Sequence, residues 1–169
     1  MAASYATLQT NDQPGLRRDL FSATVFTAGT LNGSTEHIVG LPYSDREGDG
    51  AGNGWELIAV VLSAGVNTTH TDTVPQITAT VEKNTDGGTS ALATAPVIAN
   101  TAGTGRRTTG AAATGITQAV MSATEANKRF ADNDTAFVTI TETGGSGTDP
   151  SDVSCTLTFA RLQNWDPLA

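Results

Sequence analysis

Side chains that carry most enzyme chemistry are scarce in this 169-residue sequence, which has one cysteine and two histidines. The single cysteine, Cys155, excludes an internal disulfide and suits a reducing compartment. Its strand-like surroundings favour a small buried hydrophobic residue over a reactive thiol. His37 and His70 lie far apart in the sequence, and no G-x-S-x-G elbow or comparable nucleophile motif is present. We therefore expect a non-enzymatic protein and assign no residue a catalytic role.

Charged residues and long apolar runs are also few. Charged residues make up 15% of the chain, and the net charge is −8. Such a protein is repelled by a phosphate backbone or an anionic membrane, so we expect neither nucleic acid nor a membrane as partner. No apolar run approaches the roughly 20 residues that span a bilayer, and the segment MAASYATLQTNDQPG lacks the features of a signal peptide. These absences predict a chain that is made in the cytosol and is not secreted by the usual route.

Threonine, alanine, glycine and valine together make up nearly half of the chain, in short strand-like runs separated by turns. Aromatic residues contribute only 5%, so strand stability must come from small and β-branched side chains. Alternation of apolar and polar residues is clearest in 75–83, where Ile77, Ala79 and Val81 share one face. We expect about seven to nine short strands with polar connections, which favours an all-β fold, an antiparallel β-sandwich of jelly-roll type. The predicted strands are 20–28, 36–41, 55–64, 75–83, 90–100, 115–122, 134–143 and 152–162.

The chain divides into one domain with two extensions. Residues 1–19 show neither helical nor strand periodicity and are predicted to form an extended N-terminal arm. Residues 20–162 form the predicted β-sandwich domain, and residues 163–169 form a C-terminal tail. The only helical pattern, in 122–130, predicts at most one short helix.

An acidic, glycine-rich segment carries the one metal-binding pattern in the sequence. Its spacing matches an EF-hand calcium loop at positions 1, 3, 5, 6, 9 and 12, occupied by Asp45, Glu47, Asp49, Gly50, Asn53 and Glu56. Asp45, Asp49 and Glu56 are therefore the candidate calcium ligands, and no other cofactor is expected. The alternative is a solvated acidic loop, because no amphipathic helix flanks the segment and Glu56 falls within a predicted strand.

Two further groups of residues have a functional and a structural interpretation. The aromatic residues near predicted loops and arms could form a carbohydrate platform, but burial in the core or a subunit contact is favoured for Trp55, Trp165, Tyr5 and Tyr43. The basic pairs could contact an acidic neighbouring surface, although a solvated pair is favoured for Arg17-Arg18 and Arg106-Arg107.

Three short motifs in roughly the last two-thirds of the chain resemble the β-sandwich modules of tailed-bacteriophage virion proteins. They are Val81-Glu82-Lys83-Asn84, the step from Phe130 to Asp134, and Leu157-Thr158-Phe159. The chain is most similar to a capsid decoration, or cement, protein. This resemblance implies a homotrimer made in the host cytoplasm that binds the major capsid protein on the outer surface of the virion head.

Two alternatives remain open. The first is a tail or baseplate glycan-binding module for host attachment, assisted by calcium at Asp45, Asp49 and Glu56. The second is a small hydrolase on a jelly-roll scaffold, for which no nucleophile or metal-ligand cluster is evident.

Overall fold

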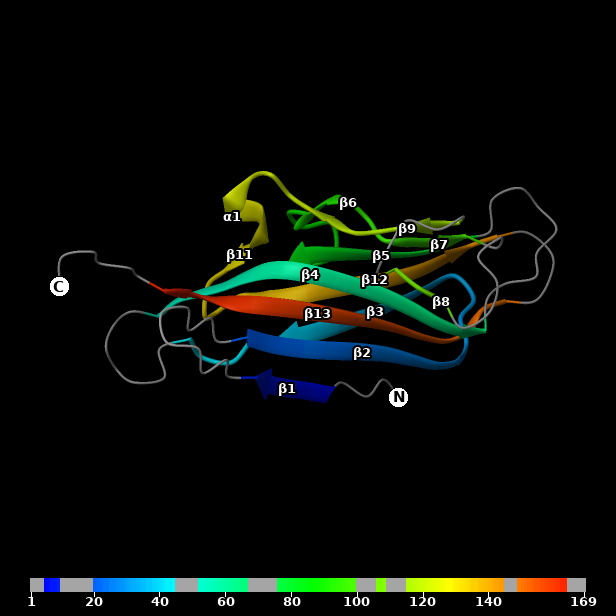
Figure 1. Cartoon of the computed structure of the whole chain (residues 1–169), viewed down its shortest axis with the longest axis horizontal. Helices are drawn as coiled ribbons and strands as arrows, with labels where there is room; N and C mark the ends of the chain where they lie inside the picture. The colour runs from blue at the N-terminus through cyan, green and yellow to red at the C-terminus, as the bar shows by residue number, and fades with distance from the viewer. Residues whose placement is uncertain are drawn as a thin grey trace.

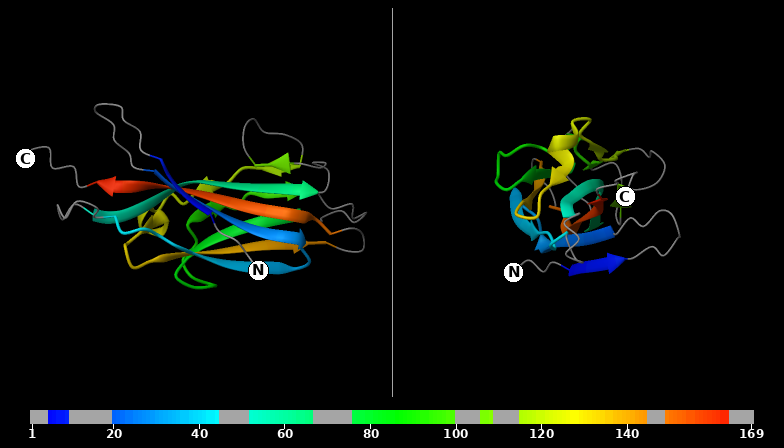
Figure 2. Two further views of the ribbon diagram at one scale, coloured as in Figure 1. Left: turned by 90° about the horizontal axis from the view of Figure 1, so that it is seen from below. Right: turned by 90° about the vertical axis from the view of Figure 1, so that its left-hand side faces the viewer.

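Two antiparallel β-sheets face each other across a shared apolar interior (Figure 1, Figure 2). The computed structural model describes residues 5–9, 20–44, 52–66, 76–99, 106–108, 115–144 and 149–163. The first sheet consists, in order, of β1 (Tyr5–Gln9), β2 (Leu20–Thr30), β13 (Ser151–Gln163), β4 (Gly52–Val66) and β11 (Arg129–Phe130), with β8 (Arg106–Arg107) also paired to β4. The second sheet consists of β3 (Ser34–Gly40), β12 (Thr135–Thr143), β5 (Gln76–Lys83), β7 (Val97–Ala99) and β9 (Ile116–Thr117).

The order of the strands is that of a jelly roll. From β2 and β13 inward along the sequence, the strands form nested pairs. β2 pairs with β13, β3 with β12, β4 with β11, and β5 with β7. These nested antiparallel pairs correspond to one long hairpin that is wrapped into two sheets. Pairing of β13 with β4 joins the nested pairs within the first sheet, and pairing of β12 with β5 joins them within the second. The predicted all-β antiparallel sandwich of jelly-roll type is confirmed.

The core consists of the alternate residues that point inward from the long strands. On β13 these are Val153, Cys155, Leu157 and Phe159, all fully buried. The same alternation gives β2, β4, β5 and β12 one buried face each, because successive side chains of a strand point to opposite sides. Most of these inward side chains are small or β-branched, as the composition requires. The largest gather at one end, where the rings of Phe21, Trp55, Phe159 and Phe130 are in contact.

Several local features differ from the sequence-based expectations. Tyr5–Gln9, in the predicted arm, forms strand β1 and pairs with β2, a pairing that the irregular sequence of the arm does not signal. The predicted strand 90–100 is split around Pro96 into β6 (Leu92–Thr94) and β7, because proline cannot donate a ladder hydrogen bond. The predicted strand 115–122 is split into β9 and β10 (Val120–Met121), and β10 pairs with β6. The one described helix, α1 (Glu125–Lys128), is as short as predicted.

Candidate functional site

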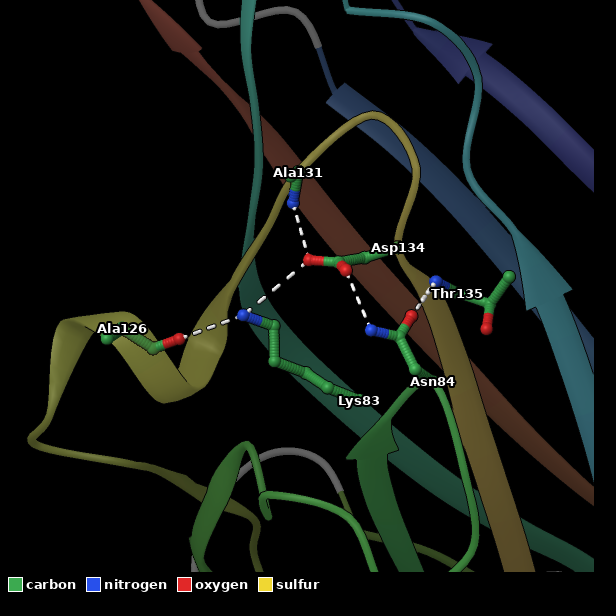
Figure 3. A network of polar contacts seen from close by, with 6 residues as sticks. All are labelled: Lys83, Asn84, Ala126, Ala131, Asp134 and Thr135. Atoms are coloured by element: carbon green, nitrogen blue, oxygen red, sulfur yellow. Dashed lines mark hydrogen bonds and ion pairs between the residues drawn. The ribbon is translucent and has the colours of Figure 1, made fainter.

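A polar network at one end of the sandwich is centred on the carboxylate of Asp134 (Figure 3). The carboxylate accepts hydrogen bonds from the backbone N–H of Ala131 at 2.8 Å and from Asn84 Nδ2 at 2.7 Å. Lys83 Nζ lies 3.6 Å from the same carboxylate, and both side chains are mostly buried. Burial alone would raise the pKa of Asp134, but the bonds from Asn84 and Ala131 and the charge of Lys83 together lower it below its ordinary value.

Lys83 and Asn84 extend this network to three other segments (Figure 3). Lys83 Nζ donates to the carbonyl of Ala126 in α1 at 3.1 Å and lies 5.6 Å from the centre of the Phe130 ring. Asn84 Oδ1 accepts from the backbone N–H of Thr135 at 2.8 Å, with Asn84 in a left-handed conformation at φ 65°. The two motifs containing Lys83-Asn84 and Phe130 to Asp134, which are far apart in sequence, thus form one structural contact that fixes α1, β11 and the start of β12.

A second set of contacts ties the chain before β4 to the same loop. Ser44 is fully buried; its hydroxyl accepts from the N–H of Gly54 at 2.9 Å, and its own N–H donates to Asp132 Oδ1 at 2.8 Å. Trp55 Nε1 donates to the carbonyl of Pro42 at 2.8 Å. Trp55 is 0% exposed, so burial is confirmed for this residue and it does not form a carbohydrate platform.

The calcium hypothesis is only partly covered by the structure. Asp45 and Asp49 lie outside the described residues. Glu56 lies on β4 and pairs with Lys128 of α1, with 2.7 Å between Oε1 and Nζ. Within the described ranges, no group of three or more His, Cys, Asp and Glu side chains could hold a metal ion. Calcium binding therefore stays a prediction, and Glu56 already has a cationic partner.

The remaining candidate residues have separate positions. Arg106-Arg107 forms β8 along the edge of β4, where Thr108 both donates to the carbonyl of Leu62 and accepts from its N–H. Arg107 is exposed there, and Tyr43 is 65% exposed. The backbone of Tyr5 lies in β1. Arg17-Arg18, His70 and Trp165 lie outside the described residues.

Cys155 and His37 are both interior residues. Burial raises the pKa of the Cys155 thiol to about 12, so the reactive thiolate is suppressed and the expected role as a small hydrophobic residue is supported. His37 is 6% exposed, and its Nε2 lies 3.2 Å from the Thr27 hydroxyl. Burial lowers the pKa of His37 below its ordinary value of 6.5.

His37 should make the stability of the protein depend on pH. Because the folded pKa is lowered, the unfolded chain takes up a proton first as pH falls below about 6.5, and the free energy of unfolding decreases until the folded imidazole also titrates. His37→Gln should flatten this dependence, as measured by urea unfolding at a series of pH values. His70 is present in both the native protein and the variant, so its contribution cancels when the two pH profiles are compared. An unchanged pH profile in the variant would contradict the buried neutral imidazole.

The outer face of the first sheet carries a regular array of uncharged side chains. Three rows of cross-strand partners from β2, β13 and β4 make up this array, and all nine side chains are partly exposed. We name it the uncharged face: Ser22, Thr158 and Ala59; Thr24, Thr156 and Val61; Phe26, Ser154 and Ser63.

Hydroxyl groups on the uncharged face hydrogen-bond to one another across the strands. Ser22 and Thr158 are joined at 3.2 Å, and Thr24 and Thr156 at 2.8 Å. By contrast, the outer face of the second sheet carries Glu36 and Glu82 among its threonines. The uncharged face is not apparent from the sequence. Its signal is the alternation of Ser and Thr with apolar residues in 22–26 and 153–159, but that pattern does not reveal that the strands are neighbours.

No helix in the part of the chain that the structure describes is long and apolar enough to cross a membrane. Comparisons with protein-family models, with curated proteins and with solved structures give no match, so no family, activity or partner follows from similarity.

Proposed function

We propose that this chain is a non-enzymatic structural protein of a bacteriophage virion, which binds the outer capsid surface and stabilises the head as a decoration protein. Its proposed partners are the major capsid protein and other copies of itself, in a homotrimer. Double-sheet jelly rolls occur in viral capsid proteins, although also in lectins and cupins, so the fold alone does not carry the proposal. The resemblance of the three sequence motifs to phage virion modules supports the same function.

The uncharged face is the observation that carries the proposal. The centres of protein–protein interfaces are depleted of charged residues. Along β2, β13 and β4 the charged residues lie only beyond the ends of this face, at Glu56, Asp152 and Arg161. The exposed Arg107 of β8 lies at its side, opposite Ser63. The paired hydroxyls keep their hydrogen bonds when water leaves, which reduces the cost of burying them. This face therefore suits a broad contact with another protein surface.

The charged side chains of the described part are consistent with a structural role. Lys83 pairs with Asp134, Lys128 with Glu56, and Arg129 with Glu125, and each pair joins or stabilises elements of the fold. Attachment to a shell by surface contact needs no reacting group.

A charge introduced at the centre of the uncharged face should weaken attachment to capsids. Thr156→Glu should lower the affinity for shells assembled from the major capsid protein of the same phage by about tenfold or more, because a carboxylate is buried there without a partner. The measurement is co-sedimentation of the purified protein with these shells over a range of protein concentrations. Thr80→Glu is the matched control, since it adds the same charge at an exposed position on the opposite sheet.

Equal loss of binding in both variants would mean that net charge, and not the uncharged face, controls attachment. Failure of the unaltered protein to bind shells, together with a saccharide signal on a glycan array that a chelator abolishes, would replace the proposal by the host-attachment module. The proposed homotrimer is checked separately by light scattering after size-exclusion chromatography.

A further inference from the structure

We propose that the edge strand β3 pairs with β3 of a second copy of this chain, antiparallel, with Ile38 opposite Ile38 of the second copy. The pairing would join the second sheets of two copies into one continuous sheet. It is a two-fold contact, so it is separate from the three-fold contact of the proposed trimer, and it does not depend on binding to capsids.

The hydrogen-bond register shows which backbone groups of β3 are unpaired by β12. Glu142 N–H donates to the carbonyl of Gly33 at 2.7 Å, in the same register as the β3–β12 ladder. Bonded pairs in an antiparallel ladder recur at every second residue, so positions 35, 37 and 39 bond to β12. The N–H and C=O groups of residues 34, 36, 38 and 40 therefore point to the other side, where no described strand pairs with β3. On the other side of β12, the N–H of Asn84 donates to the carbonyl of Thr135. Odd-numbered residues of β12 therefore bond toward β5 and even-numbered ones toward β3, which agrees with this assignment.

The free edge of β3 lacks the usual protection against pairing. Sheet edges are commonly blunted by lysine, proline, bulges or very short strands. Over its seven residues β3 contains no lysine or proline, and Glu36 is its only charge. The outermost strands of the sheets elsewhere in the described residues are shorter, with five residues in β1 and two each in β8, β9 and β11.

An apolar side chain lies on this edge. Ile38 is 67% exposed, whereas its cross-strand neighbour Phe137, on the same outer face, is only 9% exposed. With Ile38 opposite Ile38, the two copies would form a row of four apolar side chains, Phe137 and Ile38 from each. Cross-strand pairs of β-branched residues stabilise a sheet.

The charge on β3 disfavours the registers that are shifted toward Ser34. Only outward-pointing residues can exchange hydrogen bonds, so even-numbered positions must face each other. Placing Ile38 opposite Ile38 puts Glu36 opposite Gly40 and leaves the two Glu36 residues four positions apart, about 13 Å along the strand. A shift of two residues toward Ser34 would put Glu36 opposite Ile38 of the second copy, so that the two glutamates become diagonal neighbours about 7–8 Å apart. A second shift of two residues would put the two glutamates directly opposite each other.

Gly40 fits the same arrangement. It does not have a positive φ, and a Cβ atom at this position would meet no atom within 4 Å. Nothing in the described part of the chain therefore requires glycine here. A glycine within a strand can mark the close approach of another backbone, and opposite Glu36 of the second copy it would leave room for the longer side chain.

Disulfide formation tests both the pairing and its register. In Ile38→Cys, the introduced thiols would be on directly opposed residues with Cα atoms about 5.5 Å apart, within disulfide range. In the matched variant Ser34→Cys, which keeps Glu36, they would be eight positions apart along the strand, more than about 25 Å. Native Cys155 is fully buried and should not react. We expect Ile38→Cys to form a covalent dimer on a non-reducing gel at least about tenfold faster than Ser34→Cys. Equal rates, or no dimer from Ile38→Cys, would overturn the proposal.

A second pair of variants tests the backbone contact. Ile38→Pro removes an N–H that points away from β12, so the β3–β12 ladder keeps its bonds while the edge loses a donor. Ile38→Thr keeps the N–H and the branched side chain. Light scattering should show a concentration-dependent increase in mass for the native and Thr proteins that is lost in Ile38→Pro. Retention of that increase in a folded Pro protein would contradict the pairing. If the Pro protein does not fold, the cross-linking rates alone decide. Capsid binding is a separate readout, so failure here leaves the proposed function standing.

Discussion

Gly54→Ala should destabilise the protein by at least about 4 kcal/mol, a large fraction of the roughly 5–15 kcal/mol by which an ordinary domain is stable. Gly54 has a φ of +89°, which L side chains rarely adopt, and an added Cβ would lie 2.0 Å from the Phe130 carbonyl oxygen and 2.9 Å from Ala131 Cα. Neither backbone can easily move, because Phe130 pairs with Trp55 and the Gly54 N–H is bonded to buried Ser44. The measurement is urea unfolding followed by tryptophan fluorescence.

Gly33→Ala is the control that separates backbone strain from the steric clash. Gly33 has a similar φ of +79°, but an added Cβ would meet no atom within 4 Å. Only the conformational cost should appear there, about 1–2 kcal/mol. Equal destabilisation by the two substitutions would show that close packing against Phe130 is not what makes Gly54 necessary.

Asp134→Ala should lower the free energy of unfolding by about 3 kcal/mol. The substitution removes a carboxylate that accepts from Ala131 and Asn84 and pairs with Lys83, and hydrogen bonds to a charged group contribute about 1.5–3 kcal/mol. It also leaves the mostly buried ammonium of Lys83 without its carboxylate. Chemical denaturation at neutral pH measures the loss. Asp86→Ala, in the exposed turn after Lys83, should change stability by no more than about 0.5 kcal/mol.

The carboxylate of Asp134 also makes the free energy of unfolding depend on pH in the acid range. The pKa of folded Asp134 is lower than its ordinary value of 3.8, so its stabilising contribution is complete above that value and is lost as pH falls through the folded pKa. Asp134→Asn should therefore unfold less steeply with acid than the native protein, although it is less stable at neutral pH. Parallel acid profiles for the two proteins would contradict the assigned network.

The long strands could be predicted from the sequence because their alternation is local. The inward series in β5 and β13, and the break at Pro96, follow from side-chain period and from the missing N–H of proline. The short partners β1, β8 and β11 could not, since strands of two to five residues carry too few side chains to show a period. Their pairing is fixed by the neighbours that the fold brings to them.

For the candidate sites, too, local features could be predicted from the sequence and contacts between distant segments could not. Glu56 fitted the calcium spacing, but the contact that the structure gives it comes from Lys128, 72 positions later, which no local motif contains. The uncharged face requires three strands that are far apart in the sequence, so neither its extent nor its lack of charge is visible in any one segment. Only the strand order shows where the hydroxyl groups of serine and threonine gather.

The nested strand order also governs when this protein can fold during synthesis. β13 lies between β2 and β4, so those two strands have no shared neighbour until Ser151–Gln163 has been translated. When β12 has just been synthesised, the nascent chain already contains the apolar faces of β2 and β4. It cannot yet join these two strands into one sheet, because β13 is still missing. At ordinary elongation rates of about 5–20 residues per second, synthesis from the end of β12 to the end of β13 takes about 1–4 seconds. Completion of the first sheet therefore waits for β13, and a chain truncated before β13 should be prone to aggregation.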